Sequence, residues 1–204
     1  MAPQKKTLSS SERDEEERAT FRRRARGIEP NLFVWVDECG THTSMARRYA
    51  RAPKGERAYA SVPRNRGKNT TLIASMTLEG AMGEAVAFEG STKAFVFEAY
   101  VERFLAPTLR PGQIVVMDNL SAHKTDRVRQ LIEARGAELW FLPAYSPDLN
   151  PIEEAFSKIK ALLKKAAART REALVKAMGE ALLAVTPRDA AGWFAHCGYE
   201  GQPS

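Results

Sequence analysis

The chain has 204 residues, a net charge of +6 and 44% hydrophobic residues, which is the composition of one ordinary globular domain. No apolar run approaches the roughly 18–20 residues that cross a bilayer, which excludes a membrane-spanning class. Residues 1–10 have no apolar core, so we expect no secretory signal. The only two cysteines, Cys39 and Cys197, are too few for a disulfide framework and favour a reducing, cytoplasmic setting.

Positive charge is concentrated in two stretches of the sequence. Residues 47–68 carry eight basic side chains and one acidic side chain. Residues 158–176 carry seven basic side chains and one acidic side chain. Each phosphate that a basic side chain neutralises releases counterions, so such stretches indicate a polyanion-binding surface. Lysines and arginines that only solvate a surface are the alternative. The candidate phosphate contacts are Arg47, Arg48, Arg51, Arg64, Arg66, Lys68, Lys160 and Lys164.

The N-terminal part of the chain is expected to be an appendage. Within residues 1–29, the stretch 9–27 has Phe21 as its only large apolar side chain, so a helix in this segment is not expected to bury a face. This segment is predicted to be a charged linker or arm, and residues 30–204 are predicted to form the domain. Residues 32–36 (LFVWV) form a continuous apolar run, typical of a strand that is covered on both faces.

The remaining elements alternate between strands and helices. Prolines and glycines in residues 47–68 predict turns and short strands there. Further strands are predicted at residues 70–78, 85–88, 113–117 and 139–142. Helices are predicted at residues 91–105, capped by Ser91, and at 125–134, 151–165 and 170–185, with a closing segment at 193–199. This order predicts an α/β fold in which a mixed sheet is flanked by helices.

Two of the predicted strands run directly into a carboxylate, Asp37 and Asp118. Ligand-binding side chains gather at strand ends in open α/β sheets, so the two aspartates are candidates for a shared site. An aspartate followed by an asparagine, as in Asp118-Asn119, is also a common way for a strand to enter a turn. The sequence leaves that alternative open for each aspartate taken alone.

A third candidate acid, Glu153, begins the helix predicted at residues 151–165. Its alternative role is a capping-box glutamate behind an Asn150 cap. Glu154 is a rival, about 100° around the helix. The buried stripe of this helix is expected to contain Ile152, Phe156, Ile159 and Leu163. The adjacent face carries Glu153, Ser157, Lys160 and Lys164.

Three stretches of the sequence carry a family resemblance. Residues 36–38 (VDE), 116–124 (VMDNLSAHK) and 142–153 (LPAYSPDLNPIE) resemble bacterial insertion-sequence transposases of the mariner-like superfamily. Between Asp118 and Glu153 lie 34 residues, the spacing typical of that superfamily. The resemblance extends over most of the chain and implies a ribonuclease-H-like fold.

The resemblance also implies the chemistry. Asp37, Asp118 and Glu153 are expected to be catalytic metal ligands, with Glu153 preferred to Glu154. Three carboxylates form a hard-oxygen site suited to two Mg²⁺ ions, for which Mn²⁺ can substitute. Water then cuts DNA at the element's ends, and the freed 3′-hydroxyl attacks target DNA at TA dinucleotides. Asn119 and His123 are expected to support the ligands, although His123 equally suits a backbone-bonded position at a helix start.

The expected partners are double-stranded DNA, as transposon ends and target, and a second copy of the chain in a synaptic homodimer. Residues 1–29 lack the apolar faces of a helix-turn-helix, so an upstream helix-turn-helix polypeptide is a further expected partner. The implied location is the bacterial cytoplasm, at the nucleoid when DNA is bound.

Three alternatives accompany this interpretation. The chain could be a catalytically inactive, DNA-binding transposase remnant that competes with the full-length enzyme, or a ribonuclease H or junction nuclease. A zinc site is a third, although its residues lack paired spacing. The five zinc candidates are Cys39, His42, His123, His196 and Cys197. The tryptophans are expected in the core, since each lies within an apolar run.

Overall fold

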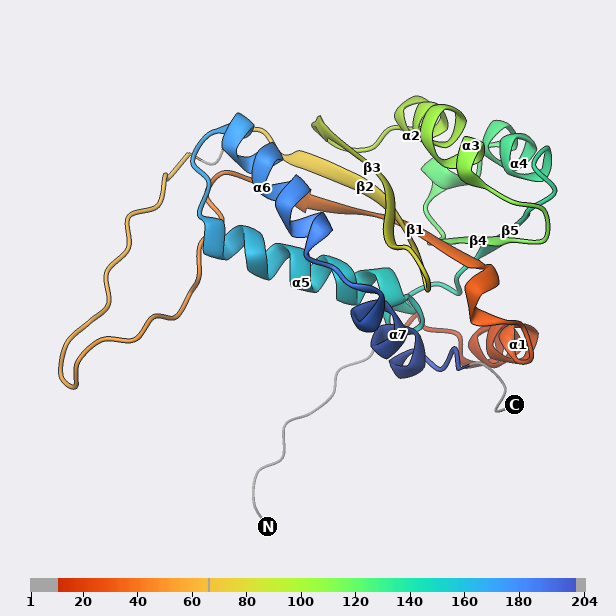
Figure 1. The fold of residues 1–204 in the computed structure, drawn as a ribbon, viewed down its shortest axis with the longest axis horizontal. Helices are drawn as coiled ribbons and strands as arrows, with labels where there is room; N and C mark the ends of the chain where they lie inside the picture. Colours follow the sequence, from red (N-terminus) through yellow and green to blue (C-terminus); the bar gives the residue numbers. More distant parts are fainter. Residues whose placement is uncertain (1–10, 66, 201–204) are drawn as a thin grey trace, which may run out of the picture.

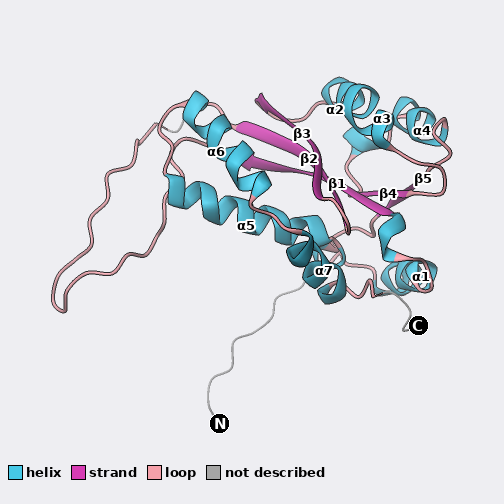
Figure 2. Cartoon of the chain, viewed as in Figure 1, coloured by secondary structure: helices cyan, strands magenta, loops and turns pink. Residues whose placement is uncertain are grey.

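The computed structural model describes residues 11–65 and 67–200. The expectation that residues 1–10 are no secretory signal, and the predicted phosphate contact Arg66, therefore lie outside the described residues. Helices lie on both faces of one sheet (Figures 1 and 2). The strands are β1 (Phe33–Thr41), β2 (Thr70–Thr77), β3 (Ala81–Glu89), β4 (Ile114–Met117) and β5 (Glu138–Phe141). The helices are α1 (Glu15–Ala25), α2 (Ala94–Tyr100), α3 (Ala106–Thr108), α4 (Asp126–Glu133), α5 (Pro151–Ala166), α6 (Arg171–Leu183) and α7 (Pro187–His196).

The described strands form a five-stranded mixed sheet in the order β3-β2-β1-β4-β5. The β1 strand pairs antiparallel with β2 and parallel with β4, and β5 continues the parallel half. The parallel pairing of β1 with β4 ends at Val36 and Met117. The next residues, Asp37 and Asp118, therefore follow matched positions on neighbouring strands.

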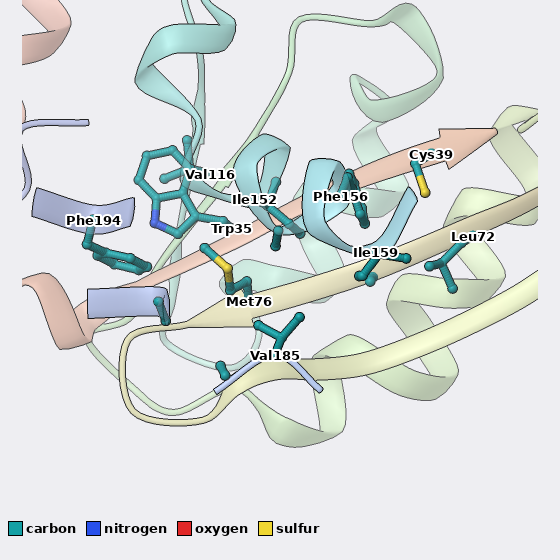
Figure 3. Close-up of a cluster of buried hydrophobic side chains, with 14 of the residues drawn as sticks. Trp35, Cys39, Leu72, Met76, Val116, Ile152, Phe156, Ile159, Val185 and Phe194 are labelled. Carbon is teal, nitrogen blue, oxygen red and sulfur yellow. The ribbon is translucent and has the colours of Figure 1, made fainter. Parts of the chain in front are cut away.

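Side chains of β1 alternate between two hydrophobic cores, which explains its continuous apolar sequence. Phe33 and Trp35 lie in the core against α5, α6 and α7, whereas Val34 and Val36 lie in the core against α2, α3 and α4. Figure 3 shows the first core, where residues of α5 pack on the sheet. Its labelled side chains are Trp35, Cys39, Leu72, Met76, Val116, Ile152, Phe156, Ile159, Val185 and Phe194. The predicted mixed sheet between helices is confirmed.

Strand β1 is longer than predicted. It continues to Thr41 because residues beyond Val36 pair with β2, with Asp37 opposite Ala74. The prediction that Asp37 ends a strand is therefore wrong, since it lies inside β1 where only the pairing with β4 ends. Asp118 does follow the end of β4, as predicted.

The segment between β1 and β2 leaves the body of the protein as a long loop (Figure 1). Its described residues, 42–65 and 67–69, contain turns and no helix or strand, so the short strands predicted there are wrong. After β3, the predicted cap Ser91 does not cap a helix. Helix α2 begins after Lys93 with no side-chain cap, and a π-helix (Val101–Leu105) continues it.

The expectation that a helix within residues 1–29 buries no face is wrong. Helix α1 places Phe21 and Ala25 in the core, and Phe21 meets Trp140 edge-on with ring centroids 6.0 Å apart. Arg18 is fully buried. Both of its Nη atoms donate to the Asp148 carboxylate, at 3.0 and 2.6 Å, and this pairing offsets the cost of burying the charge. The division into an arm and a domain at residue 30 remains a prediction. No helix in the described part of the chain is long and apolar enough to cross a membrane.

Candidate active site

Asp37 is a buried carboxylate with both oxygens hydrogen-bonded. The Asn150 side chain donates from Nδ2 to Oδ2 at 2.8 Å, and the Glu38 backbone N–H donates to Oδ1 at 2.7 Å. Burial raises the pKa of Asp37 to about 7; the negative charges of Glu153, Asp118 and Glu38 add to this rise, and the Glu38 N–H opposes it. The two hydrogen bonds thus hold the Asp37 side chain in one orientation.

Asp118 lies directly after β4, with a side chain that is 33% exposed. Its Oδ1 accepts the Leu120 backbone N–H at 3.1 Å, so the predicted turn after the strand is present. The same oxygen lies 2.6 Å from Nδ1 of His123. The turn and the histidine therefore both fix this carboxylate, and the turn alternative does not exclude a role in the site.

Glu153 occupies the first turn of α5 and is exposed. The capping alternative for this helix is wrong: Asn150 is the N-cap residue, but its side chain makes no cap hydrogen bond and binds Asp37 instead. Proline residues and short-range bonds shape the preceding turn, η4 (Pro147–Leu149), whose Leu149 carbonyl accepts the Tyr199 hydroxyl at 2.7 Å. This turn brings Asn150 and Glu153 to the sheet.

The three candidate acids line one pocket of about 390 Å³. They come from β1, the end of β4 and the start of α5. The lining residues are Asp37, Asp118, Asn119, Leu120, Leu142, Pro143, Ala144, Tyr145, Ser146, Pro147, Asn150 and Glu153. Glu154 faces away, with Oε1 3.3 Å from Nδ1 of His196. The structure thus brings the three acids to one pocket, and the rival Glu154 is not among the residues that line it.

The acids form an open pocket and not a closed ligand cage. Within residues 11–65 and 67–200, no three His, Cys, Asp or Glu side chains are grouped closely enough to enclose an ion by themselves. The three acids therefore share one pocket without forming a preassembled ion site among the described residues.

His123 is fully buried beside the pocket. Its Nε2 lies 3.1 Å from Oε1 of Glu38, and its Nδ1 makes the contact with Asp118, at an angle that is poor for a hydrogen bond. Burial lowers the pKa of His123, but the Asp118 and Glu38 carboxylates raise it more, to about 9. The structure places His123 against carboxylates and not, as in its alternative role, against backbone groups. Asn119 is exposed and lines the pocket.

Sequence reasoning missed two residues of this site, Glu38 and Asn150. Glu38 adjoins Asp37 in the strand and therefore points to the opposite face, a position that strand periodicity alone could have indicated. Asn150 was interpreted as a helix cap, and nothing in its sequence context indicated that its amide binds Asp37. Neither residue belongs to the acid trio: Asn150 contacts Asp37, and Glu38 contacts His123.

The predicted phosphate contacts that the structure describes lie outside the pocket lining, and all of them except the half-buried Lys160 are exposed. In the β1–β2 loop these are Arg47, Arg48, Arg51, Arg64 and Lys68, and Arg66 lies outside the described residues. Lys68 pairs with Glu89 at 2.7 Å. On α5, Lys160 and Lys164 share a face with Glu153 that lies next to the buried stripe, and Lys160 is half-buried whereas Lys164 is exposed.

The other candidates are scattered or structural. The five residues of the zinc alternative are spread over β1, the loop after it, the turn η3 (Ser121–His123) and the end of α7. Trp35 and Trp140 are buried in the core, as predicted, and Trp193 packs against it.

The sequence matches a known protein family. A family model described as DDE superfamily endonuclease matches residues 32–175. The chain belongs to this family. Comparison with curated proteins found no match.

Solved structures of Mos1 transposase share the fold of this DDE endonuclease. The Mos1 catalytic domain matches with a TM-score of 0.61 and 18% identity, covering 90% of this chain and 85% of that one. Mos1 in a paired-end complex with the left transposon end gives 0.73 and 20%, covering 97% and 63%. Mos1 in a strand transfer complex gives 0.70 and 21%, covering 98% and 63%. The chain therefore spans about 63% of the length of those two Mos1 chains, and the predicted ribonuclease-H-like fold is confirmed.

Proposed function

We propose that this chain is the catalytic domain of a transposase, which cuts DNA at the ends of a mobile element and joins the freed 3′-hydroxyl to target DNA. The observation that carries the proposal is the convergence of Asp37, Asp118 and Glu153 on one pocket from three separate elements. Membership of the DDE endonuclease family and the Mos1-like fold support it. The 34-residue spacing between Asp118 and Glu153 is consistent with the same chemistry.

Asp37, Asp118 and Glu153 would hold two Mg²⁺ or Mn²⁺ ions. The donor set fits, because all three are hard-oxygen ligands and no lysine or arginine is among the described residues that line the pocket. When bound, such ions activate the attacking oxygen and stabilise the leaving oxygen of a phosphodiester displacement. Mos1 complexes with Mg and with Mn are known, which supports both ions for this chain.

The chain's own residues orient the ligands and meet the substrate. Asn150 and the Glu38 backbone N–H fix the two oxygens of Asp37, and His123 and the Leu120 N–H fix Asp118. This preorganisation reduces the rearrangement needed when DNA arrives.

Two exposed apolar side chains stand at the pocket, Leu120 and Tyr145, and they would contact the nucleotides beside the scissile phosphate.

The proposed partners follow from this activity. Double-stranded DNA would be bound through the basic β1–β2 loop and the lysines of α5, and Asn119 would support the bound ions. Mos1 is seen in paired-end and strand transfer complexes, which supports a homodimer on transposon ends for this chain. An upstream helix-turn-helix polypeptide would read the end sequence, TA would be the target, and the bacterial nucleoid would be the place of action.

Nicking of a supercoiled plasmid with Mg²⁺ or Mn²⁺ tests the proposal. Asp118→Asn is expected to cut at least about 100-fold more slowly than the wild type, because it removes a ligand charge. Glu154→Gln is the matched control and is expected to cut at the wild-type rate, since Glu154 contacts His196 outside the pocket. Equal cutting by Asp118→Asn would contradict the proposal, and DNA binding without cutting by the wild type would favour the inactive remnant.

A further inference from the structure

The dipeptide Asp37-Glu38 presents one carboxylate to each face of the sheet, because consecutive strand residues point in opposite directions. Asp37 points to the α5 side, where Asn150 binds it. Glu38 points to the opposite side, where it meets His123. Glu38 is therefore absent from the pocket lining although it adjoins a residue that lines it.

His123 joins Glu38 to Asp118 across the end of the sheet. The imidazole is fully buried, with Nε2 3.1 Å from Glu38 and Nδ1 2.6 Å from Asp118. Its ring lies against Phe97 of α2, with centroids 4.0 Å apart and an interplanar angle of 34°. Phe97 is itself fully buried in the α2-side core, so the plane of the imidazole is fixed by packing and its rotation is fixed by the two carboxylates.

The contacts to Asp118 are made at one oxygen. Both His123 and the Leu120 N–H meet Oδ1, so the carboxylate is anchored through that atom while the side chain remains 33% exposed to the pocket. Groups that bind a ligand from outside the metal site are known to set the orientation of that ligand and to alter metal affinity by about 10- to 100-fold.

We propose that Glu38 is a positioning residue of the active site, which orients Asp118 through His123 from the face of the sheet opposite the pocket. The inference rests on the proposed function, since it assigns Glu38 to the same metal site. Without the Glu38 charge, Nε2 loses its charge-assisted hydrogen bond, and the imidazole holds Asp118 less firmly in one rotamer.

Stability alone does not account for this arrangement. The Glu38 side chain is only 10% exposed, and burying two ionisable groups costs desolvation that their attraction barely repays. A well-packed apolar pair would fill the same volume between β1 and α2 at no such cost. The geometry is instead what positioning needs: one hydrogen bond, one close carboxylate contact and one ring contact on a single imidazole.

The test measures Mn²⁺ binding without DNA, by isothermal titration calorimetry on the full chain. Glu38→Gln keeps the shape of the side chain and is expected to bind Mn²⁺ about 10- to 100-fold more weakly than the wild type. The matched control is Glu89→Gln, which removes a strand-end carboxylate paired with Lys68 away from the pocket and is expected to leave affinity unchanged. Urea midpoints of both variants separate loss of binding from loss of fold.

A double-mutant cycle tests the route through His123. His123→Asn keeps a polar atom near the Nδ1 position and removes the link to Glu38, so adding Glu38→Gln to it is expected to change the Mn²⁺ affinity no further. If Glu38→Gln does not fold, Glu38→Asp takes its place, since the shorter side chain withdraws the carboxylate from Nε2.

The Mn²⁺ affinities of these variants decide whether Glu38 positions Asp118. Wild-type affinity in the folded Glu38 variant, with Asp118→Asn still weakened, overturns the inference and leaves the proposed function standing. A full effect of Glu38→Gln in the His123→Asn background also overturns it, because Glu38 would then act by another route. Failure of the wild type to bind Mn²⁺ overturns the proposed function, and this inference with it.

Discussion

At the scale of single residues, the site depends on side chains that hold other side chains. Asp37 is fixed by Asn150 and Asp118 by His123, and the two supports approach from opposite faces of the sheet. The convergence of the three acids on one pocket was predictable from sequence, because two of them follow apolar runs and the third opens a proline-framed helix. Asn150 was not predictable, since an asparagine before a helix is far more often a cap than a carboxylate partner.

Tyr145 is a strained residue at the pocket. Its backbone is in the left-handed region at φ 54°, and its side chain is 58% exposed. A non-glycine residue there costs about 1 kcal/mol, and asparagine tolerates the conformation better. We expect Tyr145→Asn to leave the free energy of unfolding unchanged or raised by up to about 1 kcal/mol, and to slow DNA cutting about tenfold because the ring no longer stacks on a base.

Urea unfolding and plasmid nicking measure the two effects of Tyr145→Asn. Leu183→Asn is the control, since Leu183 is 87% exposed at the end of α6 and away from the pocket. Unchanged cutting by Tyr145→Asn would remove the ring from the substrate-binding surface.

At the scale of elements, α1 is where sequence reasoning failed most clearly. An apolar count found only Phe21, but the helix also buries Arg18, whose charge is matched by Asp148 of the turn η4. That partner is 130 residues away in the chain, so no local pattern could indicate it. Strand β1 was likewise predicted too short, because its second half is held by pairing with β2 and not by apolarity.

The two halves of the Arg18–Asp148 pair are expected to differ in their effect on stability. Asp148→Ala leaves a fully buried guanidinium without its main partner and should lower the free energy of unfolding by about 3 kcal/mol. Arg18→Met leaves a carboxylate that is 48% exposed and solvated, so it should cost less than about 1.5 kcal/mol. Urea denaturation measures both, and an equal or reversed order would show that Arg18 is not held chiefly by this pair.

Helix α7 should give the protein a defined acid dependence. Asp189 completes a capping box with Thr186, and Lys158 together with Thr186 lowers the pKa of Asp189 to about 2. Because the folded pKa lies below the unfolded one, this stabilisation is present above about pH 4 and is lost as the pH falls towards 2. Asp189→Asn should cost about 1 kcal/mol at pH 7.

Chemical denaturation of the wild type and Asp189→Asn at pH 7, 4 and 2.5 measures this dependence. The difference in unfolding free energy between the two proteins should shrink between pH 4 and 2.5. A difference that stays constant over this range would contradict the assigned role of the carboxylate.

At the scale of the whole molecule, the parallel centre of the sheet assembles the site. Because β1 and β4 run side by side in register to Val36 and Met117, Asp37 and Asp118 are neighbours although 80 residues separate them in the sequence. The order of apolar strands predicted the sheet and this convergence. The sequence could not predict that the basic residues 47–68 form one projecting loop, because that segment has no periodic pattern. Its described residues are exposed, and the loop leaves the body of the protein (Figure 1).

The projecting loop is expected to bind the DNA backbone. Replacing Arg47, Arg48 and Arg51 with glutamine should weaken DNA binding and reduce the slope of log K against log salt by about 0.9 for each phosphate that is no longer neutralised. Arg127→Gln and Arg129→Gln on α4, where both arginines pair with nearby glutamates, form the control. Fluorescence anisotropy over a salt series measures the slope, and an unchanged slope would reject binding of the DNA backbone by this loop.

The proposed chemistry requires that three carboxylates from three elements share divalent ions. Anomalous diffraction from crystals of the chain soaked in Mn²⁺ is the decisive measurement. We expect anomalous peaks in contact with Asp37, Asp118 and Glu153, and no such peaks in Asp118→Asn. Manganese bound only elsewhere, or none in the pocket at saturating concentration, would show that the three acids do not form a metal site.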